Sequence, residues 1–213
     1  MRSAIVISAG GPVRRALPPW PDDAIVIAAD GGAIEAGRLG MRVDRLVGDL
    51  DSAPAEVVAR LRADGVPIER YPEDKDASDL ELAIEVALRE DAEHVLVLGG
   101  DGGRLDHLLG TGFLLASDRW TGVQLDAVLG AALLHVVRDE RALTGEPGEL
   151  ISLFAMGGPA VGVSTTGLRW RLDDDTIVPG STRGLSNEFV DATATVRVRG
   201  GVVLAVRPGT ESP

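Results

Sequence analysis

Two carboxylates, Asp49 and Asp51, follow a short apolar run in the stretch Arg45 to Ser52, which reads RLVGDLDS. In an extended chain, residues two apart point to the same side, so both carboxylates can converge on one point. Two aspartates at the end of a buried strand favour a hard cation, and magnesium beside phosphate oxygens is the usual case. The alternative is a loop that contains Asp only because Asp suits turns.

More acids and a basic residue lie in the segment YPEDKDASDLELAIEVALRED. Its apolar residues recur at helical spacing, and Ser78 opens a capping-box pattern, which predicts a helix that starts near Ser78. Asp76 then lies just before the helix and Asp79 in its first turn, where an acid also suits the helix dipole. Lys75 is the only lysine of the chain. We expect Lys75 to neutralise a phosphate and Asp76 to complete a metal site.

Glycine pairs follow two of the predicted strands. The apolar run Ala24 to Ala29 ends in Asp30, Gly31 and Gly32, before a short predicted helix. Glycines here allow backbone amides to approach an anionic ligand closely. A tight strand-to-helix turn, in which glycine serves geometry alone, is the favoured alternative for this motif taken by itself.

A second glycine stretch, Gly99 to Arg104, lies between the predicted strand His94 to Leu98 and a helix that extends to Ala116. Its glycines and its arginine predict a phosphate cradle made of backbone amides and a guanidinium. The stretch is neither a Walker sequence nor a dinucleotide fingerprint. His107 in the following helix could be catalytic, but a structural role in the first turn is favoured.

The elements around these motifs predict two domains. Up to Leu129, continuous apolar runs alternate with helical segments, which is typical of an α/β domain with a parallel, Rossmann-like sheet. From about Ala131, short predicted strands alternate with Gly, Pro and Asp turns, which is typical of an all-β sandwich. They are Leu133 to Val137, Glu149 to Phe154, Val161 to Thr165, Leu168 to Leu172, Thr193 to Val198 and Val202 to Val206, with Arg199 to Gly201 as a candidate hairpin turn. We therefore predict an α/β domain over residues 1–130 and a β-sandwich over residues 131–213.

Composition narrows the class of protein. The chain has 213 residues, of which 45% are hydrophobic, and it contains no cysteine. A net charge of -12 argues against nucleic acid or an anionic membrane surface as a partner. No apolar run approaches the roughly 18 residues that span a bilayer, and the start MRSAIVISAGGP is typical of a first strand. We expect a cytoplasmic protein.

The predicted sandwich carries its own candidate binding residues. The segment Gly184 to Phe189 contains Ser186 and Asn187, the latter being the only asparagine of the chain. Hydroxyl and amide groups can bond a polar ring such as an aminopyrimidine, although a polar turn is the alternative. Trp170 could stack on a ligand ring, but burial in the core is favoured for a single Trp.

Five motifs in this order resemble the thiamine pyrophosphokinase family over almost the whole chain. They are ADGGA from Ala29, GDLDS from Gly48, DKDASDLELA from Asp74, GGDGGRLDH from Gly99 and GLSNEF from Gly184. The resemblance implies a nucleotide-binding α/β domain followed by a β-sandwich. It also implies a homodimer that holds thiamine between subunits and uses magnesium and ATP. The reaction would transfer the diphosphoryl group of ATP to the hydroxyl of thiamine and release AMP.

The resemblance also implies roles for single residues, which we carry over as predictions. The predicted catalytic acids are Asp30, Asp49, Asp51, Asp76 and Asp79, of which Asp49, Asp51 and Asp76 would hold magnesium. The predicted ATP-binding and phosphate-binding residues are Gly31, Gly32, Lys75, Gly100, Gly102, Gly103, Arg104 and Asp106. The predicted thiamine-binding residues are Trp170, Ser186 and Asn187. Whether Asp76 or Asp79 is the closer metal ligand, or the general base, stays open.

Two features depart from the family pattern: Leu50 stands where Phe is usual, and Lys75 where Gln is frequent. Two other functions are compatible with the same scaffold. A non-catalytic regulator that binds nucleotide or thiamine should have lost an acid from these motifs, and no acid is missing. A kinase that moves one phosphoryl group and releases ADP would use the same metal cluster.

Overall fold

The computed structural model describes residues 2–102 and 104–209, and its chain divides into two compact units. The first unit comprises the chain up to Leu105 together with Gly122–Gly130. The second comprises Asp106–Thr121 and the chain from Ala131 onward. The segment Asp106–Thr121, which carries most of one helix, thus groups with the second unit and not with the residues that precede it.

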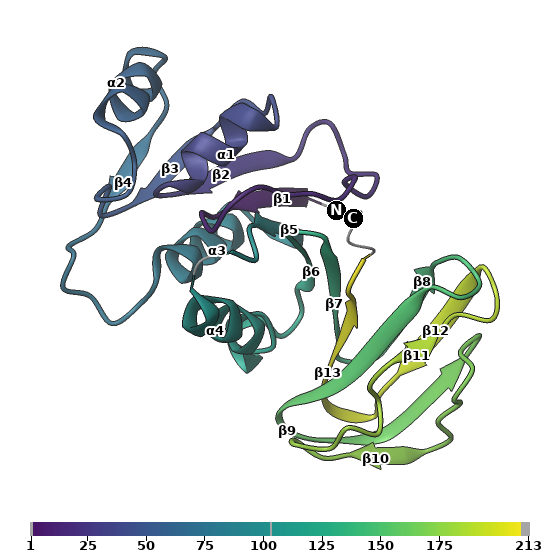
Figure 1. Ribbon diagram of the computed structural model, residues 1–213. Coiled ribbons are helices and arrows are strands. Elements are labelled where there is room, and N and C mark those ends of the chain that lie inside the picture. The colour runs from purple at the N-terminus through teal and green to yellow at the C-terminus, as the bar shows by residue number, and fades with distance from the viewer. Residues whose placement is uncertain (1, 103, 210–213) are drawn as a thin grey trace. The chain divides into compact units, whose positions relative to one another are not determined.

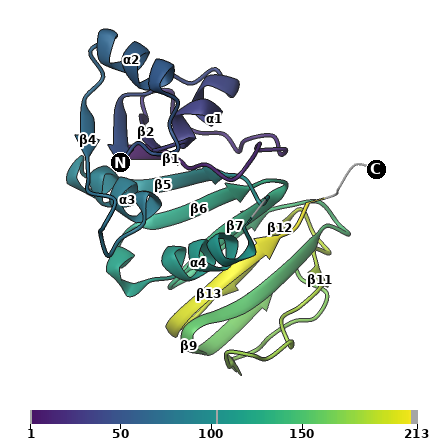
Figure 2. The same ribbon diagram turned by 60° about the vertical axis from the view of Figure 1, so that its left-hand side comes forward.

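A parallel sheet forms the centre of the first unit, in the strand order β4-β3-β2-β1-β5-β6. Its central strands are almost entirely buried, as their uninterrupted apolar sequences predict. Figure 2 shows β1, β5 and β6 side by side. The strands are β1 (Arg2–Ile7), β2 (Ile25–Ala29), β3 (Arg45–Gly48), β4 (Ile68–Arg70), β5 (Ala92–Gly99) and β6 (Gln124–Leu129).

Helices cover both faces of this sheet (Figure 1). Helix α1 (Gly32–Arg38) packs against β1 and β2, and α3 (Asp79–Arg89) packs against β1, β2, β3 and β5 from the other face. Helix α2 (Ala55–Ala63) connects β3 to β4. Ser78 caps α3, because its hydroxyl accepts a hydrogen bond of 3.2 Å from the backbone N–H of Glu81. The predicted helix start is confirmed.

Strands β1 and β5 are neighbours in the middle of this order. The strands that follow β1 in the chain (β2, β3 and β4) lie on one side of the pair, and β6, which follows β5, lies on the other. In open α/β sheets, ligands bind at the carboxyl ends of the strands, at such a switch point. The loop that contains Gly10 follows β1, and the loop that contains Gly100 follows β5. Asp30 follows β2 on the same edge, and Asp49 follows β3.

The second unit contains helix α4 (Leu105–Leu115) except its first residue, a short 3-10 helix (Asp118–Trp120) and an antiparallel β domain in the order β7-β13-β9-β12-β8. Strands β10 and β11 pair with β9 outside that order. The buried core includes Ile151, Leu153 and Phe189. The strands are β7 (Ala132–Val137), β8 (Glu140–Thr144), β9 (Leu150–Thr166), β10 (Asp175–Ile177), β11 (Asn187–Glu188), β12 (Thr193–Arg197) and β13 (Gly200–Arg207).

Several boundaries in this domain differ from the sequence prediction. The two strands expected near Phe154 and Val161 form the single strand β9, which continues through left-handed glycines at positions 157 and 162. The strand expected over Leu168 to Leu172 is absent, since only an isolated bridge joins Leu168 to Phe189. The turn near Gly200 does not close a hairpin, because β12 and β13 both pair with β9 and not with each other.

Within the described part of the chain, no helix combines the length and the apolar character that crossing a membrane requires.

Candidate active site

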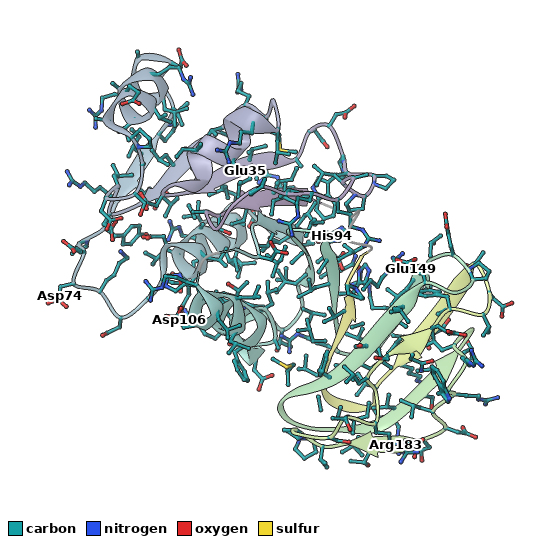
Figure 3. The ribbon with its side chains drawn as sticks, in the orientation of Figure 1. Glu35, Asp74, His94, Asp106, Glu149 and Arg183 are labelled. Carbon is teal, nitrogen blue, oxygen red and sulfur yellow. The ribbon has the colours of Figure 1, made fainter. Side chains whose placement is uncertain are left out.

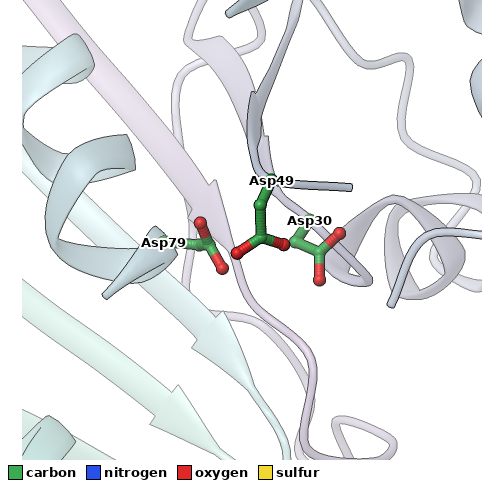
Figure 4. A group of neighbouring side chains, drawn as sticks. All are labelled: Asp30, Asp49 and Asp79. Carbon is green, nitrogen blue, oxygen red and sulfur yellow. The ribbon is translucent and has the colours of Figure 1, made fainter. Parts of the chain in front are cut away.

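Three carboxylates meet at the carboxyl edge of the parallel sheet. Asp30 follows β2, Asp49 follows β3 and Asp79 lies in the first turn of α3. One oxygen of each lies within 4.8 Å of the others, and Figure 4 shows the three side chains close together. We call these residues the acid cluster. Such a set of hard oxygen ligands suits Mg²⁺.

The backbone around the acid cluster is bent sharply to bring these carboxylates together. Asp30 has φ 46° and Leu50 has φ 69°, both in the left-handed region that non-glycine residues seldom adopt. Gly48, the last residue of β3, has φ 143°, and a Cβ atom there would lie 3.0 Å from Asp79 Oδ1 and 3.1 Å from Asp30 Cβ. Glycine is therefore required at position 48 for both conformation and space.

Asp51 does not join Asp49 in the way that the alternating pattern predicts. Strand β3 ends at Gly48, and the left-handed Leu50 turns the chain, so the segment is not extended. Asp51 is exposed, its carboxylate accepts a hydrogen bond of 2.9 Å from Ser52 Oγ, and its N–H donates to Asp49 Oδ1 at 3.2 Å. The argument from strand alternation was therefore wrong, and a metal role for Asp51 stays a prediction.

Of the two acids near the start of α3, the structure brings Asp79 into the acid cluster, whereas Asp76 is exposed in the preceding loop. The sequence left this choice open. Asp79 also suits the helix dipole, which is why its position alone carried no functional signal. Its Oδ1 atom is buried without a hydrogen bond, although it lies 3.1 Å from the ammonium of Lys75.

Asp30 is the most buried member of the acid cluster, with 6% of its surface exposed. Its Oδ2 atom accepts a hydrogen bond of 3.2 Å from the N–H of Ser52, but its Oδ1 atom is buried with no partner. Burial raises the pKa of Asp30 above its ordinary value, and the nearby charge of Asp79 adds to the effect. An unpaired buried carboxylate oxygen is costly to the fold and is therefore a strong indication of an absent ligand.

Lys75 lies against the acid cluster, with 13% of its side chain exposed. Its Nζ atom donates a hydrogen bond of 2.6 Å to Asp49 Oδ2. That bond is the main cause that lowers the pKa of Asp49. Burial by itself would lower the pKa of Lys75, but the hydrogen bond to Asp49 and the negative charges of Asp49 and Asp79 outweigh burial and raise it.

The two glycine loops at the switch point contact each other closely. A Cβ atom at Gly100 would lie 1.8 Å from the carbonyl oxygen of Gly10, which accepts a hydrogen bond of 3.0 Å from the N–H of Gly102. Close packing of the loops therefore explains the glycine at position 100, and the N–H of Gly102 is already bonded. Asp101 also joins the loops, because its carboxylate pairs with Arg14 at 2.6 Å. Sequence reasoning named neither residue of this ion pair.

Helix α1 holds the loop after β1 through a buried side chain. Glu35, labelled in Figure 3, is 4% exposed, and its Oε1 atom accepts a hydrogen bond of 2.9 Å from the N–H of Val13. Gly31 and Gly32 at the start of α1 are buried, and a Cβ atom at Gly32 would lie 2.0 Å from the carbonyl oxygen of Ile7. Packing against β1 therefore accounts for Gly32, and its phosphate role stays a prediction.

The remaining predicted phosphate residues lie beyond the two glycine loops. Arg104 is exposed, as is Asp106 in the first turn of α4. Gly103 falls outside the described residues. His107 is exposed on α4. His94, labelled in Figure 3, lies within β5, where its Nε2 atom is 3.0 Å from Asp126 Oδ2.

In the second unit, Asn187 holds Trp170 in place. The Asn187 side chain is 4% exposed, its Nδ2 atom donates to the carbonyl oxygen of Trp170 at 2.8 Å, and its Oδ1 atom accepts from the N–H of Trp170 at 3.0 Å. The same Oδ1 atom accepts from the N–H of Glu188 at 2.9 Å. The amide is thus engaged with backbone, so its main effect is to orient Trp170.

Trp170 itself is 54% exposed, which shows that the favoured expectation of a core residue was wrong. Arg169 lies over its indole ring at 5.2 Å. Ser186 is exposed at φ 57°, and its N–H donates to Ser152 Oγ at 3.1 Å, which leaves the backbone there tightly turned. An exposed aromatic ring and an exposed hydroxyl are therefore the groups that this unit can offer a ligand.

A parallel sheet with an acid cluster at its carboxyl edge is a frequent setting for enzymes that transfer phosphate-containing groups. Two sequence families match the chain in the same order. The thiamin pyrophosphokinase catalytic domain matches residues 18–125, and the thiamin pyrophosphokinase vitamin B1 binding domain matches residues 134–203. The chain belongs to the thiamin pyrophosphokinase family and is therefore an enzyme. The predicted fold class, an α/β domain followed by a β domain, is confirmed.

Individual relatives agree with this membership. Thiamine pyrophosphokinase of Bacillus subtilis is 25% identical over 95% of this chain and 97% of its own. Thiamine pyrophosphokinase 1 of Oryza sativa subsp. japonica is 27% identical over 83% of this chain and 76% of its own. The crystal structure of thiamin pyrophosphokinase from Geobacillus thermodenitrificans superposes with a TM-score of 0.79 at 26% identity, covering 98% of both chains.

Proposed function

We propose that the protein transfers the terminal diphosphoryl group of ATP to the hydroxyl of thiamine and releases thiamine diphosphate and AMP. Family membership supports the reaction, and one structural observation supports its location. Carboxylates of Asp30, Asp49 and Asp79 converge within 4.8 Å beside the glycine loops of the switch point. Phosphoryl-transfer sites consist mainly of such positioning and charge-neutralising groups.

The acid cluster fits a magnesium ion. Its ligands are hard oxygens, it contains more negative charge than Lys75 can neutralise, and the buried Oδ1 atom of Asp30 has no partner. Asp30, Asp49 and Asp79 would hold the ion, with Asp51 at the exposed rim. When bound, magnesium would offset the negative charge of the triphosphate.

The chain's own residues would position the two substrates. Arg104 and the loop around Gly100 would face the phosphates of ATP, and Lys75 would add a positive charge. Asp79, which lies in the acid cluster, is a better candidate than the exposed Asp76 to accept the proton of the attacking hydroxyl. Most of the rate enhancement would come from alignment of that hydroxyl with the β-phosphorus.

Thiamine recognition would depend on the exposed ring of Trp170. An aromatic face that is 54% exposed and backed by the guanidinium of Arg169 suits a flat heterocycle such as an aminopyrimidine. Asn187 would act as a positioning residue, because its amide forms hydrogen bonds with both the N–H and the carbonyl oxygen of Trp170. Ser186 would offer its exposed hydroxyl to a polar atom of the ring.

We further propose a homodimer in the cytoplasm. Leu105, Leu109 and Phe113, which are 70%, 56% and 62% exposed, follow one another at a spacing of four on α4 and form one apolar stripe. Exposed apolar stripes of this kind commonly mark an interface, and two-fold dimers are the commonest oligomers. A chain without cysteine suits a reducing compartment.

Product analysis tests the proposed reaction. Purified protein, ATP and thiamine are incubated with Mg²⁺, and nucleotides and thiamine esters are separated by chromatography. We expect AMP and thiamine diphosphate in equal amounts. ADP and thiamine monophosphate would instead identify a kinase that transfers one phosphoryl group, and no turnover would support a binding protein without catalysis.

The variant Asp49→Asn tests the site of that reaction. Loss of one charged ligand from the acid cluster should lower kcat roughly a thousandfold, because several kcal/mol of transition-state stabilisation depend on it. Asp51→Asn is the paired variant. A fall in kcat equal to that of Asp49→Asn would assign the exposed Asp51 to the metal site, and a smaller fall would argue against it. Near-normal turnover by Asp49→Asn would contradict the assignment of the acid cluster.

A further inference from the structure

Lys75 is the only lysine of the chain, and it is placed on the acid cluster. Its ammonium lies 2.6 Å from Asp49 Oδ2 and 3.1 Å from Asp79 Oδ1, and 13% of its side chain is exposed. The third carboxylate, that of Asp30, keeps a buried oxygen without a partner. A single ammonium thus neutralises part of the acid cluster and leaves the most buried oxygen unsatisfied.

The Lys75 ammonium lies where the acid cluster would bind a divalent cation. Magnesium binds carboxylate oxygens at about 2.0–2.1 Å, so an ion bound to Asp49 Oδ2 and Asp79 Oδ1 would compete with Lys75 for these two oxygens. Two cations on the same pair of oxygens would repel each other. At these two oxygens, Lys75 and the ion are therefore alternatives.

We propose that Lys75 is an internal cation that holds the acid cluster together in the metal-free enzyme and moves away when a divalent cation binds. The inference rests on the proposed function, which assigns a metal to the same carboxylates. Lys75 precedes the Ser78 cap of α3, so its movement requires no change in the helix. Its flexible four-carbon stem allows the ammonium to leave the carboxylates while the backbone stays in place.

This role has a consequence that a phosphate-binding lysine alone would not have. Removing a residue that only binds phosphate should leave metal affinity in the absence of ATP unchanged. Removing an internal cation should instead raise that affinity, because the entering ion no longer displaces a bound ammonium. A variant without the Lys75 ammonium should also be less stable than the parent in the absence of metal. Its acid cluster would keep carboxylates within 4.8 Å of one another with no positive charge to offset their repulsion.

The test is direct binding of Mn²⁺, measured by electron paramagnetic resonance without ATP or thiamine. Lys75→Met keeps the length of the side chain and removes its charge, and we expect its Kd for Mn²⁺ to fall about tenfold, which corresponds to about 1.4 kcal/mol. Arg2→Met is the matched control, because it removes one positive charge from an exposed pair with Asp91 at the start of β1. Its Kd should stay within about twofold of the parent value.

Thermal unfolding supplies the second measurement. Metal-free Lys75→Met should melt below the parent protein, and saturating Mn²⁺ should raise its Tm by more than it raises that of the parent. An unchanged or weaker affinity in Lys75→Met, while the parent binds Mn²⁺, would overturn the role of Lys75 and leave the metal site intact. If neither the parent nor Lys75→Met binds Mn²⁺, the metal assignment itself fails, and the inference fails with it.

Discussion

Replacing Asp30 by asparagine should make the metal-free protein more stable while it removes activity. The Asp30 carboxylate is 6% exposed and shares the acid cluster with Asp49 and Asp79. Asparagine has nearly the same shape, and its amide oxygen can still accept the hydrogen bond from the N–H of Ser52. The substitution therefore removes a charge with little change in packing.

The size of the effect follows from the charges around Asp30. With an effective dielectric of about 20, unit charges 4.8 Å apart repel by about 3.5 kcal/mol. Lys75 neutralises one of the two neighbouring carboxylates, so roughly one such repulsion is relieved. The new amide N–H₂ lacks a partner, which costs about 1–3 kcal/mol. We expect a net gain of about 1–2 kcal/mol in the free energy of unfolding, or about 2–8 °C in Tm.

The gain should depend on pH in a defined direction. Burial raises the pKa of Asp30 in the folded protein above the ordinary value of 3.8, so the folded state binds this proton more tightly than the unfolded chain does. The penalty on the parent protein is therefore absent below pH 3.8, grows as pH rises from 3.8 to the folded pKa, and is constant above it. The advantage of Asp30→Asn should be full at neutral pH and vanish below the ordinary pKa.

Urea unfolding in EDTA, at neutral pH and at low pH, measures this difference. Asp23→Asn is the matched control, since it removes the same charge from an exposed position before β2 and should change stability by less than about 0.5 kcal/mol. Turnover of Asp30→Asn should fall at least a hundredfold. A metal-free Asp30→Asn protein no more stable than its parent at neutral pH would refute the reasoning about the acid cluster.

Two further predictions concern the second unit. Asn187→Ala should raise the KM for thiamine about tenfold with little change in the KM for ATP, because Trp170 loses the side-chain bonds that orient it. Trp170→Ala should raise the same KM in steady-state assays, and equal effects of Asn187→Ala on both substrates would argue for a general loss of structure. Phe113→Glu should convert the dimer to monomer in light-scattering experiments, while Val178→Glu, a change at an exposed apolar residue outside α4, should not. A dimer that survives Phe113→Glu would place the interface elsewhere.

The sequence alone predicted the parallel sheet and the gathering of acids at one of its edges. Continuous apolar runs such as those of β2 and β5 must be buried on both faces, which requires helices on either side. The carboxyl ends of parallel strands then meet at one edge, so the acids after β2 and β3 had to lie near each other. The cap at Ser78 was equally local, because it depends on residues three apart.

The sequence did not predict which side chains face the site, because this depends on backbone angles in turns. The left-handed Leu50 ends the alternation on which the convergence of Asp51 relied. Asp76 lies in the loop three residues before Asp79, and only the docking of α3 against the sheet shows which of the two reaches Asp49. Both acids had been named, but no local pattern could choose between them.

The β domain shows the same division between local and tertiary information. Its short alternating strands were evident in the sequence, whereas the pairing of both β12 and β13 with β9 joins residues far apart in the chain. Asn187 was singled out as the only asparagine, but only the folded chain shows that its amide is used by the backbone of Trp170. Composition and periodicity determine which residues are buried and where elements begin. The tertiary structure decides which polar groups form hydrogen bonds within the protein and which remain available to a ligand.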